Sequence, residues 1–576
     1  MRNKVDFTLP TESLFLNPGA DPGIALVRPL DFIWRPREPA VIQGFAASAF
    51  DEINEKIERF VGFTKRHKAF SQVVEINTVP VVLEQASFRK SYTTAMGKCI
   101  LSGAAGIRLL NQYRWANEAG PENPEEAVIA YFDSCRARNG GAEIPLADPS
   151  LLAGLDFAIE SRNTFNFYHF VTETLCQLCL LDDLDFTGRV FIHFPNHEEK
   201  TRAFTRAFFE TLFPELSGRV VFERAPKEYD RVISAHNLLC GFFLYPGARI
   251  DDLDDLAPSD VVWKGSRAER ASQAVLQMNS VDRNLLRLRD RALKAMEGKD
   301  FSHLPKRFWV GRDPGQARDR AMKGEDDLLA MLQLFGFERV MFETLLPIEQ
   351  IAIMANAEMM ISYHGAGFTN MLFAGADATV IEIGTLQSAI FRWGDFWPLA
   401  NVSMCRYISF FADYNTADPL VDPAFSEDGI VPVALSRRGM AVILPFVVAV
   451  LGHVPTLKLQ ADVARLVDQL IKADCPDQAF AVLQHHAALL PGHFELCRAK
   501  ADGHKRRGET EDELAALLLA FDADQTRWYT LVMIVWCAKR IEAVDTLTWA
   551  LRQLRSNFPD RFAALVKERQ WFLKYA

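Results

Sequence analysis

The chain has 576 residues, of which 49% are hydrophobic and 24% charged, and its formal net charge is −10. At about 150 residues per domain, this length predicts several hydrophobic cores. The composition excludes disordered, collagen-like and coiled-coil rod proteins, and the negative charge disfavours nucleic acid as a partner. Nine cysteines, an odd number spread over a long chain, are typical of reduced thiols.

Targeting signals and membrane spans are not apparent in the sequence. The first residues, MRNKVDFTLPTESLFLNPGADPG, contain no unbroken apolar run ahead of their prolines and acids, so no secretory signal is predicted. The longest apolar run, MAVILPFVVAVLG from Met440, is shorter than the ~18 residues that span a bilayer and contains Pro445. We expect a cytoplasmic protein, free or peripheral at the inner face of the membrane.

The first 300 residues mix strand and helix patterns. The runs VFIHF (190–194) and RVVFE (219–223) are β-rich, and the segment between them has the phenylalanine and leucine spacing of a helix. This order predicts a β-α-β unit. We expect an N-terminal α/β domain at 1–250, followed by a helical linker at 251–300 that includes the amphipathic stretch SVDRNLLRLRDRALKAMEG.

Strands and helices alternate clearly from Arg307. RFWVGR, FERVMF, EMMISY and TVIEIG are typical of strands, whereas EDDLLAMLQLFG, with Gly336 at its C-terminal end, and PIEQIAIMANA are typical of helices. Such alternation predicts parallel strands joined by right-handed crossovers. The sequence therefore indicates a second α/β domain at 301–454.

Strand patterns disappear after Pro455, and residues 455–576 are predicted to form paired helices. Pro491 and Pro559 are separated by two periods of the ~34-residue tetratricopeptide unit. The small residues Ala499 and Gly503 lie where such a repeat packs its helices closely. An ordinary helical bundle stays open as the alternative.

The segment ISYHGAGFTNMLFAGADATVIEIG (361–384) combines a strand, a glycine-containing loop and a helix start. Free amides at a helix start attract anions, and glycine lets backbone approach a phosphate. Gly365 and Gly367 would line this cradle, His364 could donate to a phosphate oxygen, and Thr369 and Asn370 would add donors. Glu382 in the next strand could accept hydrogen bonds from ribose hydroxyls.

The same segment resembles the signature of glycosyltransferase family 61. Two further segments agree with that family in order and spacing: NFYHFVTETLCQLCLL (166–181) is similar to its Asn-aromatic-Tyr-His segment, and RFWVGRDPGQARDR (307–320) to its strand with an arginine-rich loop. The resemblance covers roughly residues 160–390. Phe368 stands where family members often have leucine, and AGADAT replaces a more proline-rich turn.

The resemblance implies a GT-B architecture, in which two Rossmann-like domains face each other. It further implies a nucleotide diphosphate sugar as donor, expected to be UDP-linked, and inversion at the anomeric carbon without an obligatory metal or other cofactor. The matching motifs imply that the donor is bound by Arg312, His364, Gly365, Ala366, Gly367, Thr369, Asn370 and Glu382. Arg312 comes just after a strand, where its fork could bind a diphosphate.

The catalytic base should come from the N-terminal domain, on the acceptor side of a GT-B cleft. His169 and Glu173 would share one face of a helix, with Asn166 one turn earlier and Tyr168 also on the acceptor side. A histidine near neutral pKa suits proton abstraction, and a carboxylate beside it would fix its tautomer. The reverse assignment, with Glu173 as base, fits the same spacing.

We therefore predict an inverting glycosyltransferase that extends a surface or capsular glycan and docks a protein partner through its helical region. A non-catalytic scaffold that uses the helical repeats is the main alternative. A nicotinamide-dependent oxidoreductase would need Gly-x-Gly-x-x-Gly near a first strand, and the sequence lacks that fingerprint.

Overall fold

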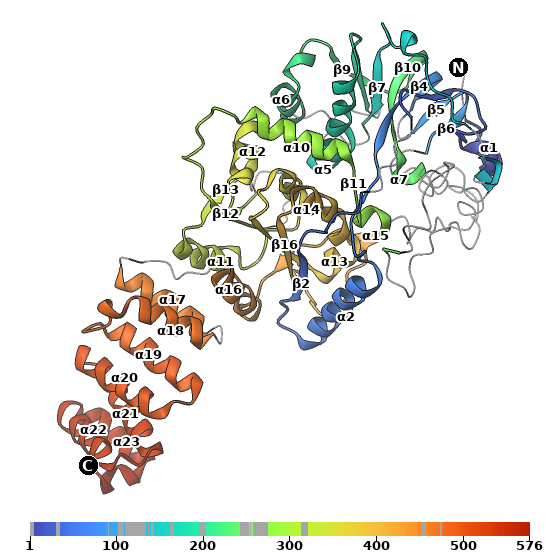
Figure 1. The fold of residues 1–576 in the computed structure, drawn as a ribbon. Coiled ribbons are helices and arrows are strands. Elements are labelled where there is room, and N and C mark those ends of the chain that lie inside the picture. The colour runs from blue at the N-terminus through green and yellow to red at the C-terminus, as the bar shows by residue number, and fades with distance from the viewer. Residues whose placement is uncertain are drawn as a thin grey trace.

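The structure is a computed structural model of the chain. It describes residues 5–29, 35–89, 92–101, 143–161, 166–194, 203–241, 275–312, 321–451, 459–472 and 475–576, together with positions 109, 134–135, 137–139, 253, 255–256 and 457. The protein is mixed α/β with more than one sheet, followed by an all-helical region at the C-terminal end (Figure 1). Most of residues 251–274, in the predicted helical linker, and residues 313–320 of the arginine-rich loop lie outside the described residues.

The first sheet is mixed and lies in the upper part of Figure 1. Its strands, in spatial order, are β6 (Lys98–Cys99), β5 (Thr93–Ala95), β4 (Thr78–Phe88), β10 (Lys227–Asn237), β7 (Phe157–Glu160), β8 (Val190–Phe194) and β9 (Val220–Arg224), with β1 (Ile24–Leu26) beside β4. Strands β10, β7, β8 and β9 run parallel. Helix α6 (Ala203–Leu212) connects β8 to β9, which is the predicted β-α-β unit.

The second sheet is parallel except for its last strand. Its order is β13 (Glu338–Val340), β12 (Arg307–Val310), β14 (Met359–Tyr363), β15 (Thr379–Thr385), β16 (Arg406–Tyr414) and the antiparallel β17 (Val433–Ala434). The chain goes from β12 outward to β13 through α11 (Glu325–Leu332), and returns through α12 (Pro347–Ala355) to β14 on the other side of β12. Ligands bind such sheets beyond the carboxyl ends of the strands where the order reverses, which here is between β12 and β14.

Local chemistry explains the ends of the helices around this sheet. Pro347 occupies the first position of α12, where its missing N–H costs no hydrogen bond, and Glu349 accepts from the backbone amide of Leu346. The α11 segment continues into a short 3₁₀ turn and ends at Gly336, whose φ of 78° is the left-handed conformation that glycine adopts readily.

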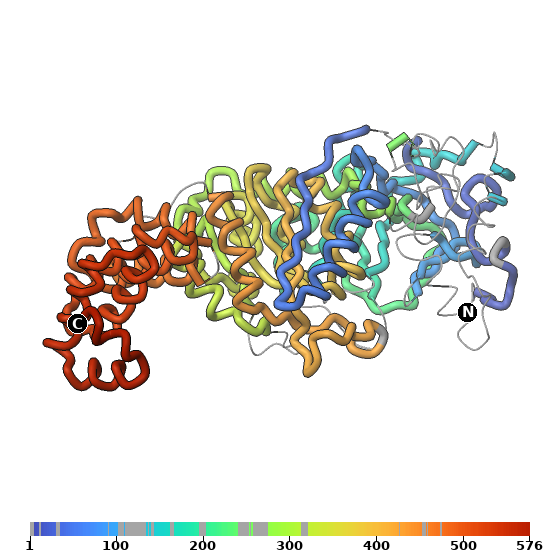
Figure 2. Tube along the Cα trace, turned by 90° about the horizontal axis from the view of Figure 1, so that it is seen from below, coloured from blue at the N-terminus to red at the C-terminus, as the bar shows by residue number. Residues whose placement is uncertain are grey.

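An N-terminal segment crosses over to the second sheet. Strand β2 (Ile42–Ala46) pairs in parallel with β16, and α2 (Asp51–His67) follows it. Figure 2 shows this blue segment beside elements of the middle of the chain. The predicted N-terminal domain at 1–250 placed these residues with the first sheet. The difference arises because strand pairing depends on tertiary contact, which a local hydrophobic pattern does not specify.

Helix α10 (Arg283–Ala295) packs between the two sheets and was predicted as part of a linker. Asp282 caps its N-terminus by accepting from the Asn284 amide, and Leu285, Leu288 and Ala292 are buried on one face. These residues belong to one hydrophobic cluster that includes Phe157 and Ile192 of the first sheet and Phe308 and Val380 of the second. The two sheets therefore share a packed core.

The C-terminal region consists of α17 (Gln460–Lys472), α18 (Pro476–His485), α19 (Phe494–Arg507), α20 (Thr510–Ala523), α21 (Trp528–Arg540), α22 (Val544–Asn557) and α23 (Pro559–Glu568). Consecutive helices pack against each other, as tetratricopeptide units do (Figure 1). A Cβ at Gly503 would lie 3.1 Å from the Phe480 ring, so a small residue is needed where α19 meets α18. No helix in the described parts of the chain is long and apolar enough to cross a membrane.

The remaining described elements are α1 (Thr11–Leu14), β3 (Val74–Glu75), η2 (Pro149–Leu151), α5 (Phe167–His169), η3 (Phe170–Thr174), η4 (Leu175–Asp183), η5 (Pro214–Leu216), α7 (Leu238–Gly241), β11 (Ser280–Val281), η7 (Gln333–Phe335), η8 (Phe342–Thr344), η9 (Ala366–Phe373), α13 (Leu386–Arg392), η10 (Trp393–Phe396), α14 (Trp397–Ser403), α15 (Phe425–Asp428), α16 (Arg437–Leu451), η11 (Ala487–Leu489) and η12 (Gln570–Lys574).

Candidate functional site

The His-Gly-Ala-Gly loop (His364–Gly367) follows the carboxyl end of β14, at the reversal point of the second sheet. Its four residues are partly exposed, whereas β14 before it and residues 368–373 after it are buried. The first N–H groups of a helix have no intrahelical acceptor, and among the described residues the amides of Gly365, Ala366 and Gly367 have none elsewhere. The loop thus presents free backbone donors at an accessible position.

Arg312 lies beside this loop, just beyond the carboxyl end of β12. Its Nη2 donates to the carbonyl oxygen of His364 at 2.6 Å, and its guanidinium is 4.7 Å from the centroid of the Tyr363 ring. A Cβ at Gly365 would collide with Nη2, so glycine allows the guanidinium to lie in this position. Burial lowers the pKa of Arg312, and no carboxylate in the described part of the chain pairs with it. A partly buried cation without a carboxylate partner is a favourable place for an anion.

His364 and Glu382 form a buried pair. The Nδ1 of His364 is hydrogen-bonded to one oxygen of the Glu382 carboxylate, and the hydroxyl of Tyr407 donates to the other. With Nδ1 held by a carboxylate, Nε2 is left for a ligand. The ribose contact predicted for Glu382 does not fit this geometry, because its carboxylate is buried on β15 and already has these two partners.

Thr369 and Asn370 were predicted as additional donors to a ligand, but both side chains are buried in η9. The amide nitrogen of Asn370 donates to Gln350 of α12 at 3.4 Å. The correction has a geometric cause: the segment is a 3₁₀ helix in which Phe368 to Phe373 all face the interior. Neither residue can contact a ligand at the loop in this structure.

The segment 166–173 follows β7 of the first sheet. Asn166 caps the short helix α5, since its side-chain oxygen accepts from the amides of Tyr168 at 3.0 Å and His169 at 3.5 Å. That interaction engages the side-chain oxygen with backbone, and the acceptor-side role predicted for Asn166 stays a prediction. The chain then widens into a π-type turn, η3, a distortion that is frequent at functional sites.

His169 and Glu173 lie together in this segment, and Nδ1 of His169 is 2.7 Å from Oε1 of Glu173. Their side chains are 25% and 43% exposed, so both are open to solvent. The carboxylate holds the Nδ1–H tautomer of a neutral imidazole, which leaves the lone pair on Nε2 free to accept a proton. This geometry is suited to general-base chemistry.

The two segments meet at η10, which the sequence did not single out. The hydroxyl of Tyr168 donates to the backbone oxygen of Asp395 at 3.0 Å, and the rings of Tyr168 and His364 each lie 5.7 Å from the ring of Phe396. Helix α5 also packs against η9. Tyr168 therefore joins the two halves of the site, and its predicted place on the acceptor side stays a prediction.

Asp395 is the charged group at this junction. Burial raises the pKa of its carboxyl group, and the nearby side chains of Arg392, His364 and His169 act in the opposite direction. Both histidines thus lie within electrostatic range of one carboxylate. No local pattern identifies Asp395, because it is part of an aromatic segment, Trp-Gly-Asp-Phe-Trp, that reads as core.

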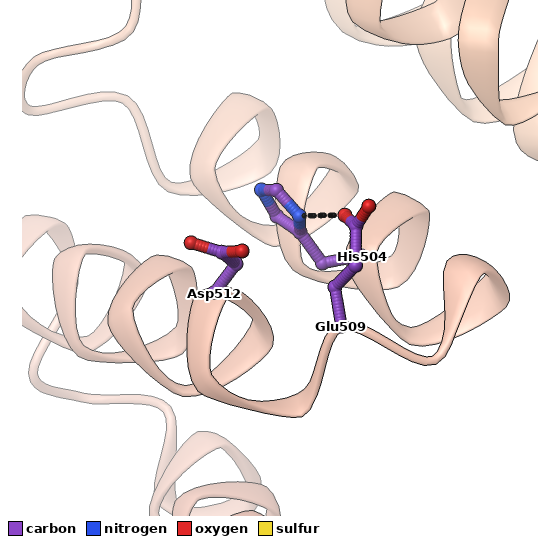
Figure 3. Close-up of side chains that lie close together, drawn as sticks. All are labelled: His504, Glu509 and Asp512. Atoms are coloured by element: carbon purple, nitrogen blue, oxygen red, sulfur yellow. Dashed lines mark hydrogen bonds and ion pairs between the residues drawn. The ribbon is translucent and has the colours of Figure 1, made fainter.

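A separate group of metal-ligating side chains lies in the helical region. Figure 3 shows His504, Glu509 and Asp512 at the connection between α19 and α20, where their ligand atoms lie within 4.8 Å of one another. Nδ1 of His504 is 2.8 Å from Glu509, whose other oxygen lies 3.5 Å from Arg507. These contacts tie the end of α19 to the start of α20, and we interpret the group as stabilising this turn.

The fold and these contacts define an α/β protein with free backbone amides at its switch point and two histidine–glutamate pairs. Residues 167–381 match the family model described as Glycosyltransferase 61. This match confirms the resemblance to glycosyltransferase family 61 that the three motifs predict. His169, Glu173, Arg312 and the His-Gly-Ala-Gly loop lie within the match. A comparison with curated proteins found no match.

Proposed function

We propose that the protein is an inverting, metal-independent glycosyltransferase of GT-B architecture. It transfers a sugar from a nucleotide diphosphate sugar, UDP-linked, to a glycan acceptor in the synthesis of a surface or capsular polysaccharide. The observation that carries this proposal is the position of Arg312: an arginine without a described carboxylate partner, next to free loop amides, at the reversal point of a parallel sheet.

The donor diphosphate would lie against the His-Gly-Ala-Gly loop. Arg312 and the amides of Gly365, Ala366 and Gly367 supply the positive groups that stabilise the negative charge of the leaving diphosphate. His364, oriented through Nδ1 by Glu382, would donate from Nε2 when protonated. Positive charge from these groups is the basis for proposing that the reaction needs no metal ion.

The acceptor hydroxyl would approach from the side of α5. His169 accepts its proton at Nε2 while Glu173, bonded to Nδ1, holds the ring and stabilises the imidazolium. The acceptor oxygen forms the new bond to the anomeric carbon from the face opposite the leaving group. The bond between that carbon and the diphosphate oxygen breaks, and the nucleotide diphosphate leaves with the electron pair.

The helical region α17–α23 is proposed to bind a protein partner. Trp536 on α21 and Trp549 on α22 keep more than a third of their surface exposed, and Leu519 on α20 keeps more than half. Large exposed apolar side chains on a repeat array are typical of a binding face.

The donor site is tested by calorimetric titration of the full-length protein with UDP and other nucleoside diphosphates. Arg312→Ala should weaken binding by about 1.5–3 kcal/mol, because a charge-assisted hydrogen bond is lost. Arg307→Ala is the matched control: Arg307 begins the same strand at its opposite end and pairs with Glu358 at 2.8 Å.

Equal affinity in the wild type and the Arg312 variant would remove Arg312 from the donor site. If no nucleoside diphosphate or nucleotide sugar binds the wild-type protein, the scaffold alternative replaces the proposal.

A further inference from the structure

A polar cavity lies where three chain segments come together, and none of its lining residues belongs to the loop or to the His169–Glu173 pair. It has a volume of about 570 Å³ and is lined by Arg35, Pro36, Arg37, Glu75, Arg283, Leu286, Arg287 and Asp290. Residues 35–37 lead to β2 of the second sheet, Glu75 belongs to β3 just before β4 of the first sheet, and the others lie on α10. The volume is within the ~300–1,000 Å³ of small-molecule sites.

The lining is positively charged, since four arginines face two carboxylates. Glu75 is nearly fully buried and accepts from Nε of Arg283 at 2.7 Å. Arg287 pairs with Asp183, outside the cavity, at 2.6 Å. Arg283 therefore neutralises the charge of Glu75, and Arg287 neutralises that of Asp183.

Two of the arginines keep their charge available. In the described part of the chain, Arg35 and Arg37 have no carboxylate within ion-pair distance. The backbone of Arg37 is fixed by two hydrogen bonds to Val73, at 3.3 and 2.8 Å. In addition, Nη2 of Arg283 is buried and has no hydrogen-bond partner. A buried donor without a partner is costly unless a ligand satisfies it.

We propose that this cavity binds the anionic group, a phosphate or a carboxylate, of a small polar ligand such as a charged sugar. The forks of Arg35 and Arg37 and the Nη2 of Arg283 supply the donors, in the geometry that guanidinium groups use for such anions. The ligand would join segments that belong to both sheets, so its binding stabilises the crossing between them. The cavity shares no residue with the proposed donor and base sites, and the inference does not depend on glycosyl transfer.

The test measures binding of inorganic phosphate, glucuronate and neutral glucose to the full-length protein by calorimetry at low ionic strength. Arg37→Gln should weaken binding of the anions by about tenfold, and Arg35→Gln with Arg37→Gln by more, because charged hydrogen bonds are lost. Arg59→Gln, at an exposed position of α2, is the matched control and should change nothing. Any phosphate bound by Arg312 contributes equally to all these proteins, so the difference from wild type reports the cavity.

The outcomes separate the sources of the anion. Loss of phosphate binding alone in the variants supports a phosphorylated ligand, and loss of glucuronate binding supports an acidic sugar. Equal anion affinity in wild type and both arginine variants, or glucose binding as tight as that of glucuronate, overturns the proposal. Titration of each variant with UDP measures affinity at the proposed donor loop separately, and thermal denaturation verifies that each variant is folded.

Discussion

The two histidine–glutamate pairs of the site have the same chemistry in different surroundings. Each follows the carboxyl end of a parallel strand and each joins Nδ1 of a histidine to a carboxylate. The side chains are 25% and 43% exposed in His169–Glu173, but 11% and 2% exposed in His364–Glu382. An exposed pair can exchange protons with substrate and solvent, whereas a buried one mainly holds geometry. We propose that the exposed pair transfers a proton and that the buried pair positions His364 toward the donor.

The largest effect is expected from substitutions that break the exposed pair, His169–Glu173. His169→Ala should lower turnover by about 10²–10⁴ with little change in donor affinity, because general-base loss acts on the transition state. Glu173→Gln should also lower turnover and should shift the pH profile, since the carboxylate stabilises the imidazolium. Transfer rates and UDP affinity are measured together, with His303→Ala as an exposed control. Wild-type transfer by both variants would place the base elsewhere.

For folding stability, in contrast to turnover, the larger effect is expected from the buried pair. Glu382→Leu should destabilise the fold by about 3 kcal/mol, because His364 and Tyr407 both lose a buried acceptor. The matched change Glu173→Leu should cost less than about 1 kcal/mol, since exposed pairs contribute little. Urea denaturation of both variants gives the comparison, and similar losses would contradict the assignment of a buried and an exposed pair.

Two buried histidines of the first sheet should make the stability of the fold depend on pH. Burial lowers the pKa of His193 and His236, both in the first sheet, to about 4. An unfolded histidine binds a proton below about 6.5, so the unfolded state gains protons first as the pH falls. Stability is therefore complete above about 6.5 and is lost between about 6.5 and 4, by about 3 kcal/mol for each histidine.

His236→Gln should remove one such contribution. Its melting temperature should fall less between pH 7 and 4.5 than that of the wild type, whatever its absolute value. An identical pH dependence in the two proteins would show that His236 does not titrate as its burial indicates.

The smallest effect is the difference in stability expected between alanine substitutions at the two glycines of the loop, Gly365 and Gly367. Gly365→Ala should destabilise the fold by about 1 kcal/mol and displace Arg312, because the new methyl group collides with its guanidinium. Gly367→Ala should leave stability unchanged, since the nearest atom to its Cβ would be 3.5 Å away on Phe342. Thermal denaturation of the pair measures the difference, and equal melting temperatures would mean that Arg312 moves at no cost.

Sequence alone determined four strands of the second sheet and the position of its loop. Apolar runs of four to seven residues bounded by Gly336 or by helix signals correspond to β12, β13, β14 and β15, because strand and helix periods are local properties of the chain. The spacing of His169 and Glu173 also suffices for their contact, and three short motifs suffice to predict the match to family 61.

Tertiary structure alone decided which side chains reach the site. The pairing of β2 with β16 and the contact of Tyr168 with Asp395 join residues hundreds of positions apart, and no local pattern encodes such contacts. Thr369, Asn370 and Glu382 have the chemistry of ligand-binding residues, yet all three are buried, and Asn370 and Glu382 are hydrogen-bonded inside the protein. Whether a polar side chain faces a ligand or the core depends on what packs against it, and that is a property of the folded chain.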